Sequence, residues 1–173
     1  MAENRAAVEP WMRGTHEDLP AVVRAVVHAL ELAREDVERW CGHLTDEEWN
    51  LRAQGLAPAA FHVRHIARSI DRLLTYAEGG QLTAGQMELL KSEMDQRAKG
   101  SEVLEEFAAA LAGAEKRIGA FAGSDLEAKR ALGRKALPTT VGGLLVHVAD
   151  HTSRHVGQLV IAAKLAVASR GVF

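Results

Sequence analysis

The chain has 173 residues, 47% of them hydrophobic and 25% charged, a composition typical of a globular protein with one core. Its net charge of −2 excludes the strongly basic surface that most nucleic-acid-binding proteins need, so we expect no nucleic-acid partner. No apolar run approaches the roughly 20 residues of a membrane-spanning helix, so we also expect no membrane partner.

The first part of the chain predicts a long helix followed by a short one. Apolar residues spaced three or four apart predict an amphipathic helix over residues 18–44. Thr45 and Glu48 then form a capping-box pattern, which predicts a short helix from Asp46.

The middle of the chain predicts two more long helices with a shorter one between them. Pro58 suits the first turn of the second long helix, which we expect to continue through Tyr76 until a pair of glycines ends it. A shorter helix is expected over residues 83–94. Ser101 is the predicted N-cap of the third long helix, which continues to about Phe121.

The last long helix follows a connection rich in Gly, Lys and Arg at residues 123–140. Pro138 and the two threonines after it mark the start of this helix, which we expect to end at about Ser169. No segment alternates with period two, so no strand is predicted. The pattern predicts an all-α fold, a four-helix bundle with short extra helices in the connections, in a single domain over residues 1–173.

Three histidines on the last helix, His147, His151 and His155, are spaced four residues apart and therefore stack on one side of it. At 100° per residue, His151 and His155 fall within an apolar stripe and His147 falls at its edge. The stripe consists of Leu144, Val148, Leu159, Ala162 and Ala166. We therefore expect the second and third imidazoles to point into the bundle.

A divalent metal ion would explain two imidazoles in apolar surroundings. Neutral imidazoles are costly to bury without partners, and an ion would use one nitrogen of each as a ligand. The spacing matches the zinc-protease helix motif, but Thr152 stands where that motif has a glutamate, so a zinc protease is not expected. Catalytic zinc sites normally use three protein ligands and an open position, so two ligands are too few.

The second long helix offers His62 and His65 as that third ligand. Helical position slightly favours His62, which lies closer to the apolar stripe of its helix, and does not decide between the two. His16, His28 and His43 have no partner at a ligand-like spacing, so we expect no direct role for them.

Two segments, RHIARSID from Arg64 and HTSRHVGQ from His151, resemble the two signatures of the DinB-like superfamily of four-helix-bundle proteins. The resemblance spans the whole chain. It implies that His65, not His62, is the first metal ligand, and that His151 and His155 complete a set of three.

The resemblance also implies a chemistry. Members of this family bind zinc, nickel or similar divalent ions, and several are thiol S-transferases that use bacillithiol or mycothiol, or isomerases that use mycothiol. A divalent ion lowers the pKa of a thiol or water and so supplies a nucleophile at neutral pH. His147 would then support the ligands or line a pocket. Relatives commonly pair, so a homodimer is expected.

The leading hypothesis is a cytoplasmic metal-dependent thiol S-transferase or hydrolase that acts on a small electrophile in detoxification or stress metabolism. The cytoplasmic location follows from the single cysteine, Cys41, and from the lack of a secretory-signal pattern. The alternatives are a non-catalytic metal- or small-ligand-binding bundle and a helical scaffold without metal.

The sequence does not identify a general base or a substrate-recognition set. Asp71, Asp150, Arg154 and Gln158 lie near the proposed ligands in sequence. Asp150 and Arg154 are expected to face solvent or to pair with each other. Gln158 could hydrogen-bond near the site or across a subunit boundary.

Overall fold

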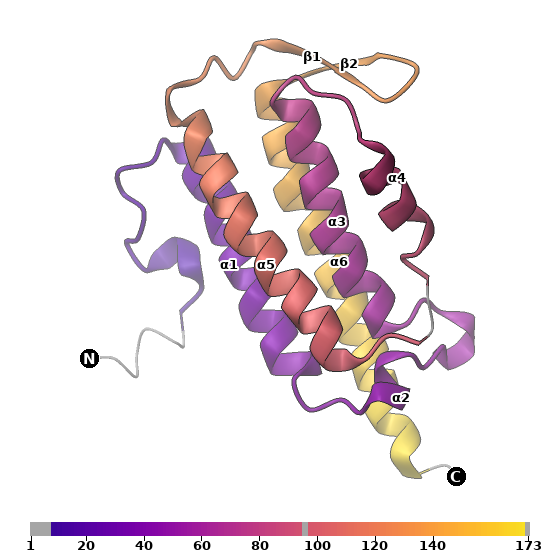
Figure 1. The fold of residues 1–173 in the computed structure, drawn as a ribbon. Coiled ribbons are helices and arrows are strands. Elements are labelled where there is room, and N and C mark those ends of the chain that lie inside the picture. The colour runs from indigo at the N-terminus through magenta and orange to yellow at the C-terminus, as the bar shows by residue number, and fades with distance from the viewer. Residues whose placement is uncertain (1–7, 95–96, 172–173) are drawn as a thin grey trace.

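Four long helices, α1, α3, α5 and α6, pack side by side into a bundle, as the helical periodicity predicts (Figure 1). The structure is a computed structural model that describes residues 8–94 and 97–171. Its α-helices are α1 (Ala21–Cys41), α2 (Asp46–Trp49), α3 (Ala59–Ala77), α4 (Ala84–Lys91), α5 (Gly100–Gly119) and α6 (Val141–Ala168). The remaining elements are η1 (Pro10–Met12), η2 (Ala53–Gly55), η3 (Ala120–Gly123), η4 (Ser169–Gly171), β1 (Lys129–Leu132) and β2 (Leu137–Thr140). The predicted all-α class is confirmed.

The apolar faces of the four long helices meet in one continuous core. Helix α6 packs against both α1 and α3, and α5 covers another side of α3. Fully buried aliphatic side chains come from each long helix; they include Val23, Val37, Ile66, Ile70, Leu74, Ile118, Leu145 and Leu159. Each such side chain contributes roughly 1.5–3 kcal/mol of burial energy. The α3–α6 interface is therefore a rigid support for side chains at its edge.

The start of α5 differs from the prediction, because a tertiary contact sets it. The helix begins at Gly100 with Lys99 as its N-cap, so the predicted N-cap at Ser101 is wrong. The backbone N–H of Gly100 donates to the carboxylate of Asp46 at 2.8 Å. A Cβ on Gly100 would lie 2.2 Å from Nε1 of Trp49, so only glycine fits against that indole. The predicted capping box before α2 is confirmed.

A two-stranded antiparallel hairpin precedes α6, where the sequence predicts no strand. Strands β1 and β2 pair with Lys129 opposite Thr140. The prediction that the chain has no strand is therefore wrong. Each strand has only four residues and none of them is fully buried, so the sequence lacks the usual strand signal. The hairpin caps its neighbours: Nε of Arg130 donates to the Ala77 carbonyl at the end of α3. The Thr140 hydroxyl accepts from the Gly143 N–H and so begins α6.

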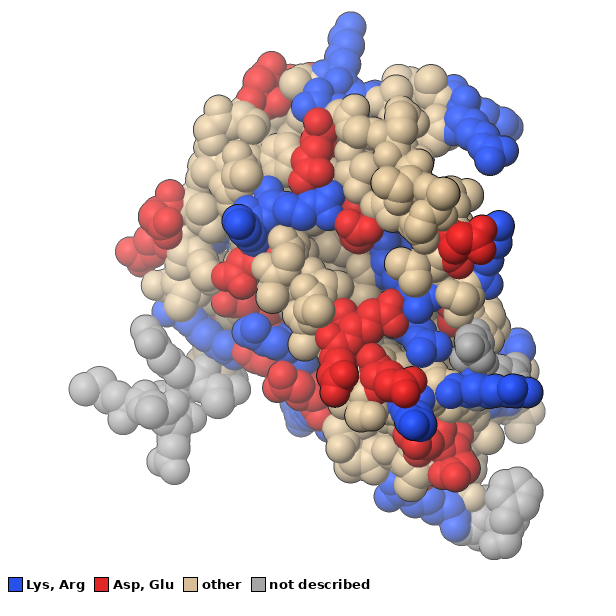
Figure 2. All heavy atoms as spheres, viewed as in Figure 1, with Lys and Arg blue, Asp and Glu red and all other residues tan. Residues whose placement is uncertain are grey.

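The surface carries both signs of charge. Lys and Arg side chains are interspersed with Asp and Glu on the face shown in Figure 2, so that face offers no continuous basic stripe. Within residues 8–94 and 97–171, every helix is too short or too polar to cross a membrane.

Candidate metal centre

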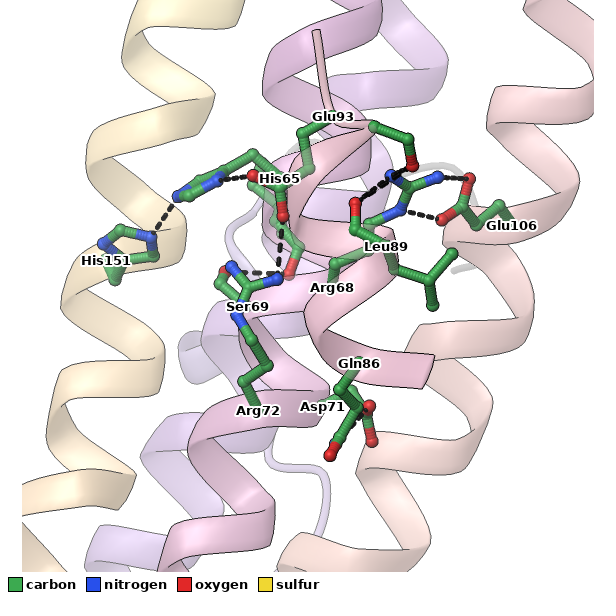
Figure 3. A network of polar contacts seen from close by, with 12 residues as sticks. His65, Arg68, Ser69, Asp71, Arg72, Gln86, Leu89, Glu93, Glu106 and His151 are labelled. Atoms are coloured by element: carbon green, nitrogen blue, oxygen red, sulfur yellow. Dashed lines mark hydrogen bonds and ion pairs between the residues drawn. The ribbon is translucent and has the colours of Figure 1, made fainter. Parts of the chain in front are cut away.

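Three histidines from two helices converge at the edge of the α3–α6 interface. His65 comes from α3, and His151 and His155 come from α6. One ligand atom from each lies within 4.8 Å of the other two. Nε2 of His65 and Nε2 of His151 are 2.8 Å apart (Figure 3). We call these three residues the central cluster.

The two α6 histidines lie beside the buried stripe of their helix and not within it. Both are partly exposed, whereas Val148, Thr152 and Val156 around them are buried. The expectation that these imidazoles point fully into the bundle is therefore corrected: the rings meet α3 at the rim of the interface. A site in this position can be reached from solvent.

The second histidine of α3, His62, lies deeper than His65 and outside the central cluster. It is only 5% exposed, and its Nδ1 lies 3.1 Å from Nδ1 of His155. Burial lowers the pKa of His62 to about 4, so this ring is neutral at neutral pH. A neutral imidazole has one donor and one acceptor nitrogen, so one of the two facing nitrogens donates and the other accepts. The contact engages Nδ1 of His155 and leaves Nε2 as the other nitrogen of that ring.

Glu93, which the sequence analysis does not single out, supports His65. This carboxylate is 4% exposed and accepts from Nδ1 of His65 at 2.7 Å. A carboxylate can only accept, so neutral His65 carries its proton on Nδ1 and turns the lone pair of Nε2 toward His151. A carboxylate behind a histidine is the usual arrangement around metal-binding imidazoles, where it fixes the ring and the tautomer.

The turn after α4 is held against α3, and this places Glu93. Arg72 donates to the other oxygen of Glu93 at 2.8 Å. Nearby, Arg68 binds Glu106 of α5 through two hydrogen bonds and donates to the Leu89 carbonyl of α4 (Figure 3). These contacts join α3, α4 and α5. Nothing in the local sequence of the turn indicates them, because each partner is at least 20 residues away.

The sequence profile of the DinB superfamily matches residues 29–159, a span that contains the whole central cluster. The chain belongs to the DinB superfamily. Comparisons with curated proteins and with solved structures gave no significant match. The recognition made from the two short segments is therefore confirmed, and the helical bundle agrees with it.

In this DinB-superfamily chain His151 and His155 are held neutral. Burial lowers the pKa of His151 to about 4, and repulsion by the other histidines adds to the effect. Burial likewise lowers the pKa of His155 to about 4, with repulsion by His65 next in importance. Metal ligation needs a neutral imidazole, so both side chains are in the right protonation state at neutral pH.

Burial alone would raise the pKa of Glu93, but hydrogen bonds from His65 and Arg72 outweigh that cost and hold it below its usual value. The carboxylate is therefore ionised at neutral pH. Three imidazole donors with an anionic group behind one of them fit a divalent transition metal.

The remaining residues near the motifs have other roles. His147 is exposed; it lies 3.8 Å from Asp150, and its ring centroid is 5.4 Å from that of His151. Asp150 and Arg154 form an exposed ion pair on α6, as expected. Asp71 bonds to Gln86 and to a guanidinium of α5, away from the central cluster. Gln158 is exposed, and the structure shows no hydrogen bond for its side chain.

A cavity of about 210 Å³ lies on the other side of α3, between α4 and α5. Arg72 lines it and also binds Glu93, so one side chain connects the cavity to the support of His65. Its other lining residues are Ala67, Arg68, Asp71, Gln86, Leu89, Glu106 and Ala110.

Proposed function

We propose that this chain is a metal-dependent enzyme of the DinB superfamily, a thiol S-transferase or hydrolase that acts on a small electrophile. His65, His151 and His155 would be the metal ligands. The observation that carries the proposal is the convergence of one nitrogen from each within 4.8 Å, from two rigid helices. Zinc or nickel is the expected ion, because imidazole donors suit both.

The side chains around the cluster would prepare it for that ion. Glu93 accepts a hydrogen bond from Nδ1 of His65, so the neutral form of that ring has an unprotonated Nε2, and His62 contacts Nδ1 of His155. Phe61 stacks on the His65 ring, with centroids 5.4 Å apart, and restricts its rotation. When bound, the ion would lower the pKa of a thiol or water and so supply a nucleophile at neutral pH.

An open site favours the enzyme over a purely structural metal site. Structural zinc sites normally have four protein ligands, whereas catalytic sites have three and an open position. In the part of the chain that the structure describes, no fourth His, Cys, Asp or Glu joins the central cluster. All three rings are partly exposed, so a small substrate would have access. A non-catalytic metal-binding bundle is the competing function.

Metal content is the first test. Protein purified without added metal and the variants His65→Ala, His151→Ala and His155→Ala would be dialysed against micromolar zinc or nickel and analysed by elemental mass spectrometry. Each substitution should lower the bound metal by one ion per chain relative to the wild-type protein, whereas His147→Ala on the same helix should leave it unchanged. Circular dichroism would check folding. A metal content equal to that of the wild type in all three folded variants would overturn the ligand assignment.

Catalysis needs its own measurement. Metal-loaded protein would be mixed with monochlorobimane and a low-molecular-weight thiol, and the fluorescent conjugate followed against the three ligand variants. Hydrolysis would be followed with an activated ester. Turnover that depends on the ligands supports the enzyme, and bound metal without turnover of either probe supports the non-catalytic bundle. Because relatives in the family commonly pair, we also propose that the protein is a cytoplasmic homodimer. Light scattering would measure its oligomeric state.

A further inference from the structure

A second group of potential ligands lies on α1, away from the α3–α6 interface. His28 and Glu31 are three residues apart on α1, and His16 comes from the segment that precedes this helix. One ligand atom of each lies within 4.8 Å of the others. We call these residues the peripheral cluster, and we propose that it is a second divalent-metal site that fastens the N-terminal segment to α1.

The geometry of the peripheral cluster brings its donor atoms together. Nε2 of His16 lies 2.9 Å from a carboxylate oxygen of Glu31. The His28 ring is 6% exposed, and its Nε2 is hydrogen-bonded to the Thr15 hydroxyl at 3.1 Å, which fixes its orientation. The two imidazole rings are tilted by 57° with centroids 5.6 Å apart, so they do not stack face to face.

Two imidazoles and one carboxylate form a recognised donor set for zinc, in which water completes the coordination. The His16 and Glu31 side chains are 26% and 22% exposed, so water can reach the cluster. His28 is the buried member of the cluster. The carboxylate would partly neutralise the charge of the ion. The cluster thus selects a divalent first-row metal such as zinc, which nitrogen and oxygen donors bind well.

Neighbouring contacts already hold the segment in place for such an ion. Arg13 binds both carboxylate oxygens of Glu35 on α1, at 2.5 and 2.8 Å, and donates to the Val8 carbonyl. The Arg13 guanidinium pairs with Glu35 and not with Glu31. The Glu31 carboxylate therefore faces His16. The Arg13–Glu35 ion pair is one connection between the segment and α1. A bound ion would add a second connection at Glu31, one helical turn earlier on α1.

Metal stoichiometry separates the two clusters. Chelator-stripped wild-type protein, dialysed against micromolar zinc, should bind close to two ions per chain. The triple variant His65→Ala/His151→Ala/His155→Ala should keep one. His16→Asn and Glu31→Gln should each keep one in the wild-type background and none in the triple variant. Asparagine is chosen because His16 has a φ of 55°, a left-handed conformation that asparagine tolerates.

His43→Ala, which removes an exposed histidine outside both clusters, is the control and should change nothing. Hydrogen exchange adds a readout of the fastening: zinc should slow exchange of the amides in residues 13–19 in the triple variant and not after His16→Asn is added. Zinc binding that His16→Asn and Glu31→Gln leave intact would overturn the peripheral site, as would a triple variant that binds no zinc. If the wild-type protein binds a single ion and only the His16 and Glu31 substitutions remove it, the result would support the peripheral site and refute the central site.

Discussion

The central and peripheral clusters offer similar donors in different settings. The central cluster is built from two long helices of the core, and Glu93 and His62 hold the outer nitrogens of two of its rings. The peripheral cluster takes one donor from a segment outside the bundle. Donors on rigid elements are already positioned, whereas a donor on a loop must be ordered when the ion binds. We therefore expect the central cluster to bind zinc more tightly.

Acid should destabilise the metal-free protein through the central cluster, and this is the largest effect that we expect. His151 and His155 have folded pKa values of about 4, against 6.5 ordinarily. Below pH 6.5 the unfolded chain takes up protons that the folded chain does not, so stability falls with falling pH until about pH 4. One pKa unit corresponds to about 1.4 kcal/mol, and solvent screening of partly exposed rings limits the loss by pH 5 to on the order of 2 kcal/mol.

Urea unfolding of chelator-treated protein at a series of pH values between 7 and 5 would measure this loss. The double variant His151→Gln/His155→Gln is the matched comparison, because it keeps polar side chains that do not titrate. Its free energy of unfolding should fall less over the same range. Equal slopes for the two proteins would show that the α6 imidazoles are not held neutral by the fold.

Removal of the carboxylate behind His65 should weaken the central site and spare the peripheral one. Glu93→Gln keeps the shape of the side chain and loses the charge that fixes the His65 tautomer. Substitutions of such supporting groups typically reduce metal affinity about 10–100-fold, and we expect a loss in that range for zinc at the central site. Isothermal titration calorimetry in the His16→Asn background, which isolates the central cluster, would measure it.

Glu88→Gln is the control for this substitution, since Glu88 is an exposed residue of α4 that pairs only with Lys91 among the contacts seen. Its zinc affinity should equal that of the parent. An unchanged affinity in Glu93→Gln would mean that the hydrogen bond to His65 does not support ligation.

The fold and the central cluster were accessible from sequence because their signals are local or belong to a family motif. Helical periodicity predicted the long helices, and the spacing of His151 and His155 placed two imidazoles on one side of α6. Position along α3 did not decide between His62 and His65. The family motif favoured His65, and the structure groups this residue, not His62, with the α6 pair.

The contacts that the sequence did not indicate all depend on tertiary packing. Glu93 lies in a turn whose position is set by arginines of α3, and no spacing rule connects it to His65. His16 and His28 are 12 residues apart, with a bend of the chain between them, so they show no ligand spacing although the fold brings them together. The start of α5 likewise depends on Trp49, which packs against Gly100.

The smallest effect that we expect tests the loop donor of the peripheral cluster. Arg13→Gln would release the segment from Glu35 without touching a ligand, so His16 would lose part of its positioning. A surface ion pair contributes little, and zinc affinity at the peripheral cluster should fall only about two- to fivefold. Titration of the triple central variant with and without Arg13→Gln would measure this.

Arg134→Gln, which removes the same charge from the exposed turn of the hairpin, should have no effect. If Arg13→Gln also has none, the segment is ordered without this ion pair, and the contrast between a rigid central cluster and a loop-dependent peripheral one would have to be abandoned. A fall at the peripheral cluster together with an unchanged central affinity would support the contrast, because only a donor outside the bundle depends on how its segment is held.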